Sequence, residues 1–98
     1  MPNGDPNTLI YWLTETLRLA RENGTPEGLK IPRRRISELI DKDVSTINDF
    51  ETGRGGWPRD PEERVGAYAE LTGIPPQELW RTAVADWIKA TTPKKRRR

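Results

Sequence analysis

The segment from Arg33 to Arg54 (RRRISELIDKDVSTINDFETGR) constrains the fold of this chain more than any other part of the sequence. Its apolar residues form two sets with helical spacing, separated by three charged residues. The first set lies at i, i+3 and i+4, so that it forms one face of a helix: Ile36, Leu39 and Ile40. The second set consists of Ile47 and Phe50, which are three apart. The segment therefore predicts two short helices joined by a tight turn at residues 41–43.

The second of these helices has a start signal and a stop signal. Asp43 fits the N-cap position, where its carboxylate can accept from the free backbone N–H groups of the first turn. Gly53 fits the C-terminal end, because glycine adopts the left-handed conformation at little cost. The sequence therefore predicts a helix from Val44 to Glu51.

Two helices of this size cannot bury their apolar faces on each other alone, so further helices are expected around them. The pair leaves one polar face uncovered: Lys42, Val44, Ser45, Asn48 and Asp49. The segment from Val44 to Thr52 is roughly 13 Å long at about 1.5 Å per residue, and the major groove of DNA is about 12 Å wide. This pattern is typical of a helix-turn-helix.

The run IDKDVSTINDFETGR resembles the helix-turn-helix of the Cro and phage-repressor (XRE-type) family. The matching positions follow one another without a gap: Ile40, Asp41, Asp43, Ser45-Thr46-Ile47, Glu51 and Gly53. Asp41 replaces the family's turn glycine, which is tolerable because aspartate enters the left-handed region more readily than most residues. The resemblance extends roughly from Leu13 to Trp80. It implies an all-α, five-helix lambda-repressor-like DNA-binding domain with the helix-turn-helix at helices 2 and 3.

Composition narrows the function classes. The chain has 98 residues, the size of one domain, and contains neither Cys nor His. Without Cys the chain lacks thiolate metal ligands. Without His it lacks both the commonest nitrogen ligand for metals and the commonest general base. Two acidic pairs, Glu62-Glu63 and Glu15 with Glu22, are better explained as helix-dipole and surface charges. We expect no enzyme activity, no metal site, no cofactor and no small-molecule ligand.

The formal net charge of +2 is unevenly distributed along the chain. Five of the 17 basic residues lie at 94–98, which leaves 12 basic against 15 acidic residues in the rest. The body of the protein is therefore net acidic. An argument for DNA binding must depend on where individual arginines lie, not on a bulk basic patch.

The ends of the chain differ in composition from its centre. Residues 1–7 (MPNGDPN) are expected to be a flexible N-terminus, residues 8–90 the helix-turn-helix domain, and residues 91–98 a disordered basic tail. No apolar run approaches the roughly 18 residues that span a bilayer, and no signal-peptide pattern is present. We therefore expect a cytoplasmic protein without a membrane partner.

The first helix is expected to begin at a cap formed by Asn7 or Thr8 and to end near Asn23. The resemblance implies that Arg21 on this helix pairs with Glu51, since the family has a helix 1 arginine that pairs with the glutamate of helix 3. A solvated surface arginine is the alternative from the sequence alone.

The connection between the first two helices is longer here than in the family. Leu29 and Ile31 are expected to fold back onto the core, leaving residues 25–28 as a surface loop. The next helix begins with three arginines, Arg33, Arg34 and Arg35. Their positive charges are repelled by the positive end of the helix dipole, and a bound anion would relieve this repulsion. DNA phosphate is the expected anion, with a solvated charge run as the alternative.

Four outward residues of the second helix of the pair are expected to read bases: Val44, Ser45, Asn48 and Asp49. Val44 suits a thymine methyl group, Ser45 can donate or accept, and Asn48 suits an adenine edge. Asp49 is repelled by phosphate but can accept from the cytosine amino group. The residues expected to contact phosphate are Arg33, Arg34, Lys42, Thr46, Arg54, Arg59, Lys94, Lys95, Arg96, Arg97 and Arg98.

The loop that follows, Gly55-Gly56-Trp57-Pro58-Arg59, suits close approach to a sugar-phosphate chain because paired glycines let backbone N–H groups come near. Trp57 has three readings: a plug on the core, which we favour, a dimer contact, or a wedge on DNA. Asp60 with Pro61 then predicts a capped start for the fourth helix, which Gly73 ends.

The last helix continues an apolar stripe for about two and a half turns. Its members are Leu79, Trp80, Ala83, Val84, Trp87 and Ile88. A domain this small has little core to cover such a stripe, so we expect a homodimer through this helix, at least on DNA. The alternative is that Trp80 and Trp87 pack against the first helix near Leu9 and Trp12.

Two functions remain after these arguments. The favoured one is a sequence-specific double-stranded DNA-binding transcriptional regulator, a small phage or prophage Cro-like repressor that acts by occupying its operator. The alternative is a protein-interaction module on the same fold, such as an antirepressor or an antitoxin-like partner, which the acidic body and Asp49 favour.

Overall fold

The computed structural model describes residues 5–54 and 56–93, and in these residues it contains five helices and no strand. The helices are α1 (Leu9–Asn23), α2 (Arg33–Ile40), α3 (Val44–Glu51), α4 (Pro61–Thr72) and α5 (Pro76–Thr91). The prediction of an all-α, five-helix fold is confirmed. The two short helices lie where the apolar periodicity of residues 33–54 predicted them.

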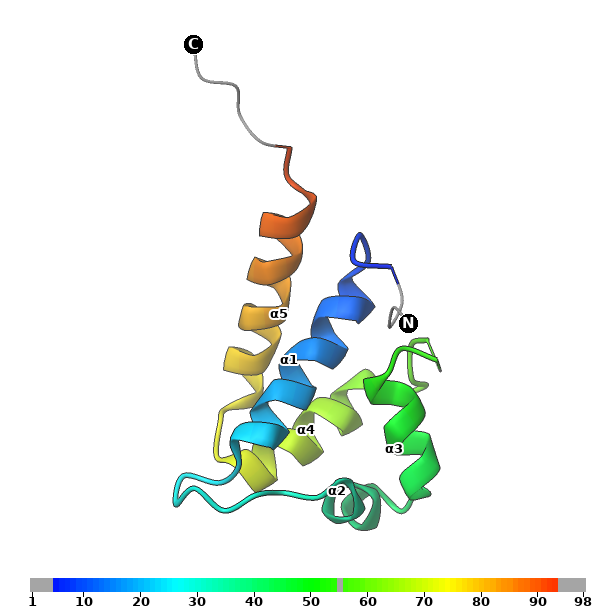
Figure 1. The fold of residues 1–98 in the computed structure, drawn as a ribbon, viewed down its shortest axis with the longest axis vertical. Coiled ribbons are helices and arrows are strands. Elements are labelled where there is room, and N and C mark those ends of the chain that lie inside the picture. Colours follow the sequence, from blue (N-terminus) through cyan, green and yellow to red (C-terminus); the bar gives the residue numbers. More distant parts are fainter. Residues whose placement is uncertain (1–4, 55, 94–98) are drawn as a thin grey trace.

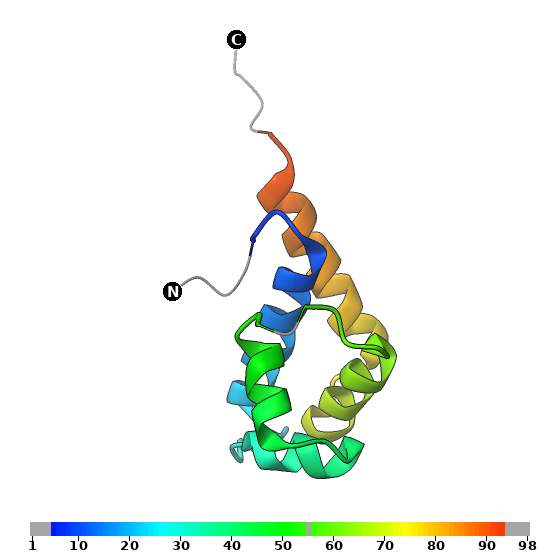
Figure 2. The same ribbon diagram turned by 90° about the vertical axis from the view of Figure 1, so that its right-hand side faces the viewer.

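The helices form a bundle with two different sides. α1 and α5 run antiparallel and lie side by side, and α4 packs against both (Figure 1). α2 and α3 contact each other at the other side of the bundle, where α2 also packs on α4 and α3 on α1 (Figure 2). α3 therefore stands away from α5, with only one of its faces against the bundle.

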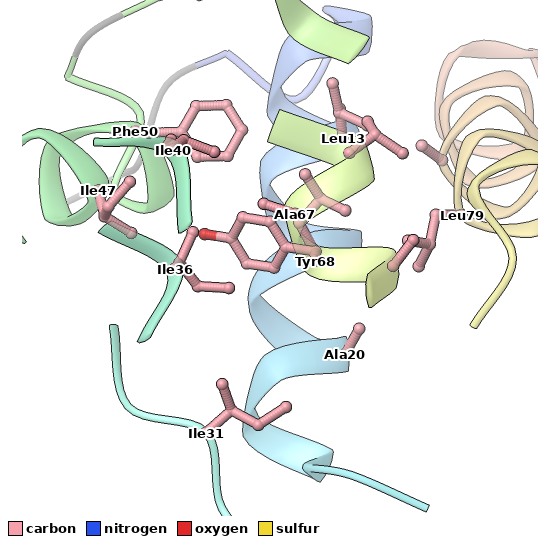
Figure 3. Packing of buried hydrophobic residues seen from close by; sticks show 14 residues of the cluster. Leu13, Ala20, Ile31, Ile36, Ile40, Ile47, Phe50, Ala67, Tyr68 and Leu79 are labelled. Atoms are coloured by element: carbon pink, nitrogen blue, oxygen red, sulfur yellow. The ribbon is translucent and has the colours of Figure 1, made fainter. Parts of the chain in front are cut away.

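All five helices contribute to one hydrophobic core. Its members include Leu13 and Leu17 of α1, Ile36 and Ile40 of α2, Ile47 and Phe50 of α3, Val65 and Tyr68 of α4, and Leu79 and Ala83 of α5. Figure 3 shows the ring of Tyr68 in the middle of this cluster, with its hydroxyl directed toward the side of α2 and α3. Each short helix is thus held by residues of other helices, since eight residues are too few for a stable isolated helix.

The turn between α2 and α3 depends on one unusual backbone conformation. Asp41 adopts the left-handed region, with φ 58° and ψ 50°, as expected for the residue that replaces a turn glycine. The N–H of Lys42 then donates to the carbonyl of Ser37 at 2.9 Å, which closes the end of α2. A similar closure ends α3, where Gly53 has φ 83° and the N–H of Arg54 donates to the carbonyl of Asp49 at 2.9 Å.

Two of the three expected side-chain caps are absent. Asp43 occupies the N-cap position of α3, but its side chain makes no capping hydrogen bond, and the same holds for Thr8 at α1. Asp43 is exposed to solvent, and the hydroxyl of Thr8 donates to the carbonyl of Asp5. Asp60 does cap α4, accepting from the N–H of Glu63 at 3.2 Å.

The loop between α1 and α2 corrects one expectation about the core. Ile31 is buried as predicted, but Leu29 is 66% exposed. The loop closes on itself because the N–H of Thr25 donates to the carbonyl of Leu29 and the N–H of Leu29 donates to the Thr25 hydroxyl. This closure turns the Leu29 side chain outward, so the prediction that it folds back onto the core was wrong.

The structure describes part of each predicted end of the chain. Residues 5–7 are held by hydrogen bonds: the indole N–H of Trp12 donates to the carbonyl of Pro6, and that of Trp87 donates to the carbonyl of Asn7. These two hydrogen bonds join residues 6 and 7 to α1 and α5. Thr91 belongs to α5 and not to the tail, which was predicted to begin there. The remaining tail prediction, for residues 94–98, lies outside the described residues.

Candidate functional site

Among the described residues, the outward face of α3 is not covered by another helix. Ile47, Phe50 and Glu51 are buried on its inner side. Since an α-helix turns about 100° per residue, Ser45 and Asp49 lie on the opposite side. The flanks of this outward face are formed by Val44, Thr46 and Asn48. Val44 and Ser45 are exposed, and Thr46, Asn48 and Asp49 are half-buried. The four predicted base-reading residues therefore share one uncovered side of the helix.

A buried carboxylate fixes the other side of α3. Glu51 has no exposed surface, and it accepts from Arg21 twice, from Nε at 2.7 Å and from Nη2 at 2.9 Å. This is the ion pair that the family resemblance implied, and the alternative of a solvated Arg21 is wrong because only 8% of that residue is exposed. Arg21 also donates through Nη1 to the carbonyl of Ile31 at 3.0 Å, so the pair ties α1 to α3 and to the connection before α2.

Two further residues join this network without having been predicted there. Arg33 donates from Nε to Glu51 at 2.9 Å, and the hydroxyl of Tyr68 donates to Glu51 at 2.7 Å. No local pattern could reveal these contacts, because they depend on α2 and α4 both lying against the end of α3. The side chains around Glu51 thus come from α1, α2 and α4, and together they set the position of α3 on the bundle.

The network changes the ionisation of its members. Burial raises the pKa of Glu51, but hydrogen bonds from Arg21, Tyr68 and Arg33 outweigh burial and hold that pKa below its ordinary value of 4.5. Burial, followed by the negative charge of Glu51, raises the pKa of Tyr68. Glu51 is therefore a carboxylate and Tyr68 a neutral hydroxyl donor at neutral pH.

Arg33 makes a contact that was not predicted for it. We predicted a phosphate contact, but its Nε is engaged by Glu51 and its side chain is only 36% exposed. Its terminal Nη groups remain as the part that can meet an anion from outside. Pairing with Glu51 holds this guanidinium beside the last residue of α3.

The other predicted phosphate-contacting cations belong to the elements that flank α3 in the sequence. Arg34 and Lys42 belong to α2 and the turn before α3, and Arg54 and Arg59 belong to the loop after it; all four are exposed. Arg34 also makes a long ion pair with Glu38, at 3.5 Å across one helical turn. Lys94, Lys95, Arg96, Arg97 and Arg98 lie outside the described residues.

The loop after α3 does not place Trp57 in the core. Its side chain is 48% exposed, so the favoured prediction of a hydrophobic plug was wrong. The loop lies over the N-terminal part of α1 instead, where Gly53 and Gly56 border a small cavity with Tyr11 and Thr14. Trp57 is left as an exposed aromatic residue between the cations Arg54 and Arg59.

Sequence reasoning missed Arg64, which lies beside the outward face of α3. Arg64 is 7% exposed, its guanidinium stacks over the ring of Phe50 at 5.0 Å, and its Nε has no hydrogen-bond partner among the residues that the structure describes. It borders a cavity of about 180 Å³ together with Thr46 and Asp49. Thr46 and Asp49 therefore lie on the side of α3 that faces this arginine. No sequence signal links Arg64 to them, because the link arises from the packing of α4.

The predicted dimer stripe on α5 divides into a buried part and an accessible part. Leu79 is 3% exposed and Ala83 is fully buried, because both pack against the protein's own core. Assigning these two to a dimer interface was wrong. The rest of the stripe can still be reached: Trp80, Val84 and Trp87 are half-buried, and Ile88 is 53% exposed.

No protein-family model matches this chain, and a search of solved structures finds no match either. Across residues 5–54 and 56–93, none of the helices combines the length and apolar character needed to cross a bilayer. The same residues contain no group of three or more acidic side chains placed to hold a metal ion.

Proposed function

We propose that this protein is a sequence-specific double-stranded DNA-binding transcriptional regulator of the Cro and phage-repressor type, which reads the major groove through α3. The observation that carries the proposal is the uncovered outward face of α3, presented by a helix whose inner face is fixed through Glu51. A reading element needs both properties, because side chains that contact base edges must be exposed and yet held in a defined place.

The dimensions and side chains of α3 suit a major groove. Its eight residues span roughly 12 Å, close to the width of the groove. Val44 would contact a thymine methyl group, Ser45 would donate or accept, and Asn48 would bond an adenine edge. Asp49 would select against bases other than cytosine, because a carboxylate accepts from the cytosine amino group and repels other acceptors.

The cations at the two ends of α3 would hold the strands on either side of the groove. Arg34 and Lys42 would contact phosphates near its N-terminal end, and Arg54 and Arg59 those near its C-terminal end. Each phosphate contact contributes about −0.9 to the slope of log K against log salt concentration on duplex DNA. The variants Arg54→Ala and Arg59→Ala should therefore each reduce that slope by about one, without changing the preferred sequence.

The regulator would act as a homodimer by occupying an operator. Two copies joined through the accessible part of α5 would present two α3 helices to successive turns of the major groove. Their half-sites would be about 34–36 Å apart, centre to centre. Occupying a promoter in this way excludes polymerase without any catalytic group.

Selection of bound sites from random duplex DNA tests the proposal directly. We expect an enriched sequence, and we expect Ser45→Ala and Asn48→Ala to alter its preferred bases while the fold is unchanged by circular dichroism. The matched control is Gln77→Ala, an exposed amide on α5, which should leave the selected sequence unchanged. Failure of the wild-type protein to enrich any sequence, together with no salt-sensitive complex in a gel shift, would overturn the proposal.

A second candidate function is a protein-interaction module of the antirepressor or antitoxin type. Two observations favour it: the net acidic body of the chain, and the carboxylate of Asp49 on the outward face of α3. Under this reading Ser45→Ala and Asn48→Ala leave partner binding unchanged, and no sequence preference is found. The same selection experiment therefore separates the two functions.

A further inference from the structure

A groove between α1 and α5 is used neither by the fold nor by the proposed DNA contact. It encloses about 250 Å³ and runs along the two antiparallel helices. Its apolar surface comes from Trp12 and Leu19 of α1, Leu79 of α5, and Ile74 just before α5. Leu19 is 49% exposed, so its side chain remains accessible to a molecule in the groove.

The charges that border this groove are all negative. Glu15 on α1 and Glu78 and Asp86 on α5 line it, and no Lys or Arg does so among the described residues. Glu15 is neutralised in part by Arg18, at 2.7 Å. Glu78 and Asp86 form no ion pair within the part of the chain that the structure describes. The groove thus combines an apolar floor with unneutralised carboxylates.

The groove faces away from α3. The loop that follows α3 lies against α1 at Tyr11 and Thr14. At about 100° per residue, Thr16 and Leu19 lie on the other side of α1 from Thr14. A molecule in the groove would therefore leave the outward face of α3 free.

The groove also lies apart from the accessible stripe of α5. On this helix, Asp86 and Ile88 are two positions apart, which places them on nearly opposite sides. Glu78 and Asp86 border the groove, whereas Val84 and Ile88 belong to the stripe. Occupying the groove is thus compatible with a dimer through that stripe.

We infer that this groove binds an amphipathic helix of a partner protein, one that carries a row of apolar side chains flanked by Lys or Arg. The lining residues of α1 extend from Trp12 to Asn23, about 16 Å along the helix, which corresponds to roughly three turns of a bound helix. Apolar side chains of the partner cover Leu19 and Ile74, and its basic side chains meet Glu78 and Asp86. The carboxylates repel nucleic acid and anionic lipid, so charge complementarity selects a basic protein segment.

Fluorescence anisotropy with two labelled peptides tests this inference on the full chain. The first probe is a helical peptide of about 15 residues with Leu at every third or fourth position and Lys on the flanks; the second has Glu in place of each Lys. We expect the Lys peptide to bind at least about tenfold more tightly than the Glu peptide. Equal binding of both peptides, or no binding of the Lys peptide up to about 1 mM, would overturn the inference.

Variants of the protein locate the binding. The double variant Glu78→Lys with Asp86→Lys should weaken binding of the Lys peptide about tenfold or more, and Leu19→Ala should weaken this binding as well. The matched control, Glu27→Lys with Glu70→Lys, makes the same change in net charge at exposed sites outside the groove and should have a much smaller effect. If the control variant weakens binding of the Lys peptide equally, the effect comes from the overall charge of the protein, and the inference is wrong.

Two further measurements distinguish helix binding in the groove from DNA binding and from self-association. Ser45→Ala should bind the Lys peptide as the wild type does, so a failure of the DNA-binding proposal leaves this result intact. Analytical ultracentrifugation of the Leu19→Ala variant without peptide tests whether a second copy of this chain occupies the groove. Loss of a dimer in that variant would overturn the inference in favour of self-association.

Discussion

Glu51 accepts four hydrogen bonds from three side chains, each of which belongs to a different helix. A carboxylate that is fully removed from water costs several kcal/mol to bury unless it is paired and its lone pairs are satisfied. Here Arg21 provides a two-point ion pair, and Arg33 and Tyr68 satisfy further lone pairs. The position of the proposed reading helix therefore depends on a single buried charge.

Replacing Glu51 by Gln should destabilise the protein strongly. The change leaves the Arg21 guanidinium buried without its counter-ion, and breaking a buried pair in this way costs about 3–5 kcal/mol. Urea denaturation at pH 7 measures the loss. The control is Glu38→Gln, which breaks the exposed pair with Arg34 and should cost less than about 1 kcal/mol. Similar losses of unfolding free energy for Glu51→Gln and Glu38→Gln would show that the contacts of Glu51 contribute little to stability.

The contribution of Glu51 should depend on pH in a defined direction. Its pKa is lower in the folded protein than its ordinary value of 4.5, so the stabilisation is fully present above that value. It is lost as the pH falls below 4.5 through the folded-state pKa, because the carboxylate must then be protonated in the folded state. The gap in unfolding free energy between wild type and Glu51→Gln should therefore narrow below about pH 4.5. A gap that is constant from pH 7 to about pH 3 would contradict this account.

Two glycines of the loop between α1 and α2 provide a matched pair. Gly24 has φ 89° and Gly28 has φ 87°, but a Cβ at Gly24 would come within 2.3 Å of the Leu29 carbonyl oxygen, whereas one at Gly28 would meet nothing within 4 Å. Gly28→Ala should cost about 1–2 kcal/mol, the strain of a positive φ alone. Gly24→Ala should cost clearly more, because the backbone of the loop must also move. Thermal unfolding of the two variants measures the difference in stability. Equal losses of stability would contradict the close approach of Gly24 to the Leu29 carbonyl.

At the level of elements, α2 and α3 depend on the turn between them. Both contain eight residues, so neither would persist alone in water. Their relative placement is set by the left-handed residue Asp41 and by the contacts that Ile36, Ile40 and Ile47 make with the core. The left-handed residue in the turn thus fixes how α2 and α3 are placed relative to each other, at a small cost in backbone strain.

Relieving that strain should stabilise the protein. Asp41→Gly removes the Cβ from a residue with φ 58°, and we expect the free energy of unfolding to rise by about 0.5–1 kcal/mol. Asp41→Val should lower it, because β-branched residues tolerate this region least. Urea denaturation of both variants measures the two effects. A stabilised Asp41→Val variant would show that the left-handed turn is not retained in solution.

At the level of the whole molecule, the bundle separates its surfaces. α3 lies on one side of the bundle and α5 on the other (Figure 1). The accessible stripe and the acidic groove both involve α5, on different faces of that helix. A dimer formed through the stripe would hold two α3 helices apart instead of covering them. This arrangement is what the proposed operator binding requires.

Ile88→Glu tests the proposed dimer. Ile88 is 53% exposed, so the charge should leave the monomer folded while opposing association across the stripe. Analytical ultracentrifugation should then show a monomer where the wild type shows a dimer, and the affinity for a two-half-site operator should fall. The control, Leu29→Glu, introduces the same charge at a residue that is 66% exposed on the loop between α1 and α2, and should leave the association unchanged. A wild-type protein that remains monomeric on its operator would contradict the dimer.

Local sequence patterns were enough to predict the helices, the left-handed turn at Asp41 and, through the resemblance to a family, the pair between Arg21 and Glu51. Periodicity and turn chemistry act over a few residues, so these features could be predicted before any packing was known. The outward face of α3 followed from the same periodicity, because the apolar positions of that helix define its inner side.

The packing of the helices determines which neighbour covers each apolar face and which charged residues from distant parts of the sequence come into contact. Leu79 and Ala83 look like the rest of the α5 stripe in sequence, yet they are buried in the core while Ile88 stays accessible. Arg33 and Tyr68 reach Glu51, and Arg64 reaches Phe50, only after α2, α3 and α4 have packed together. The physical reason is that helical spacing specifies the direction of a side chain on its own helix, whereas burial and ion pairing depend on the surface that arrives opposite it.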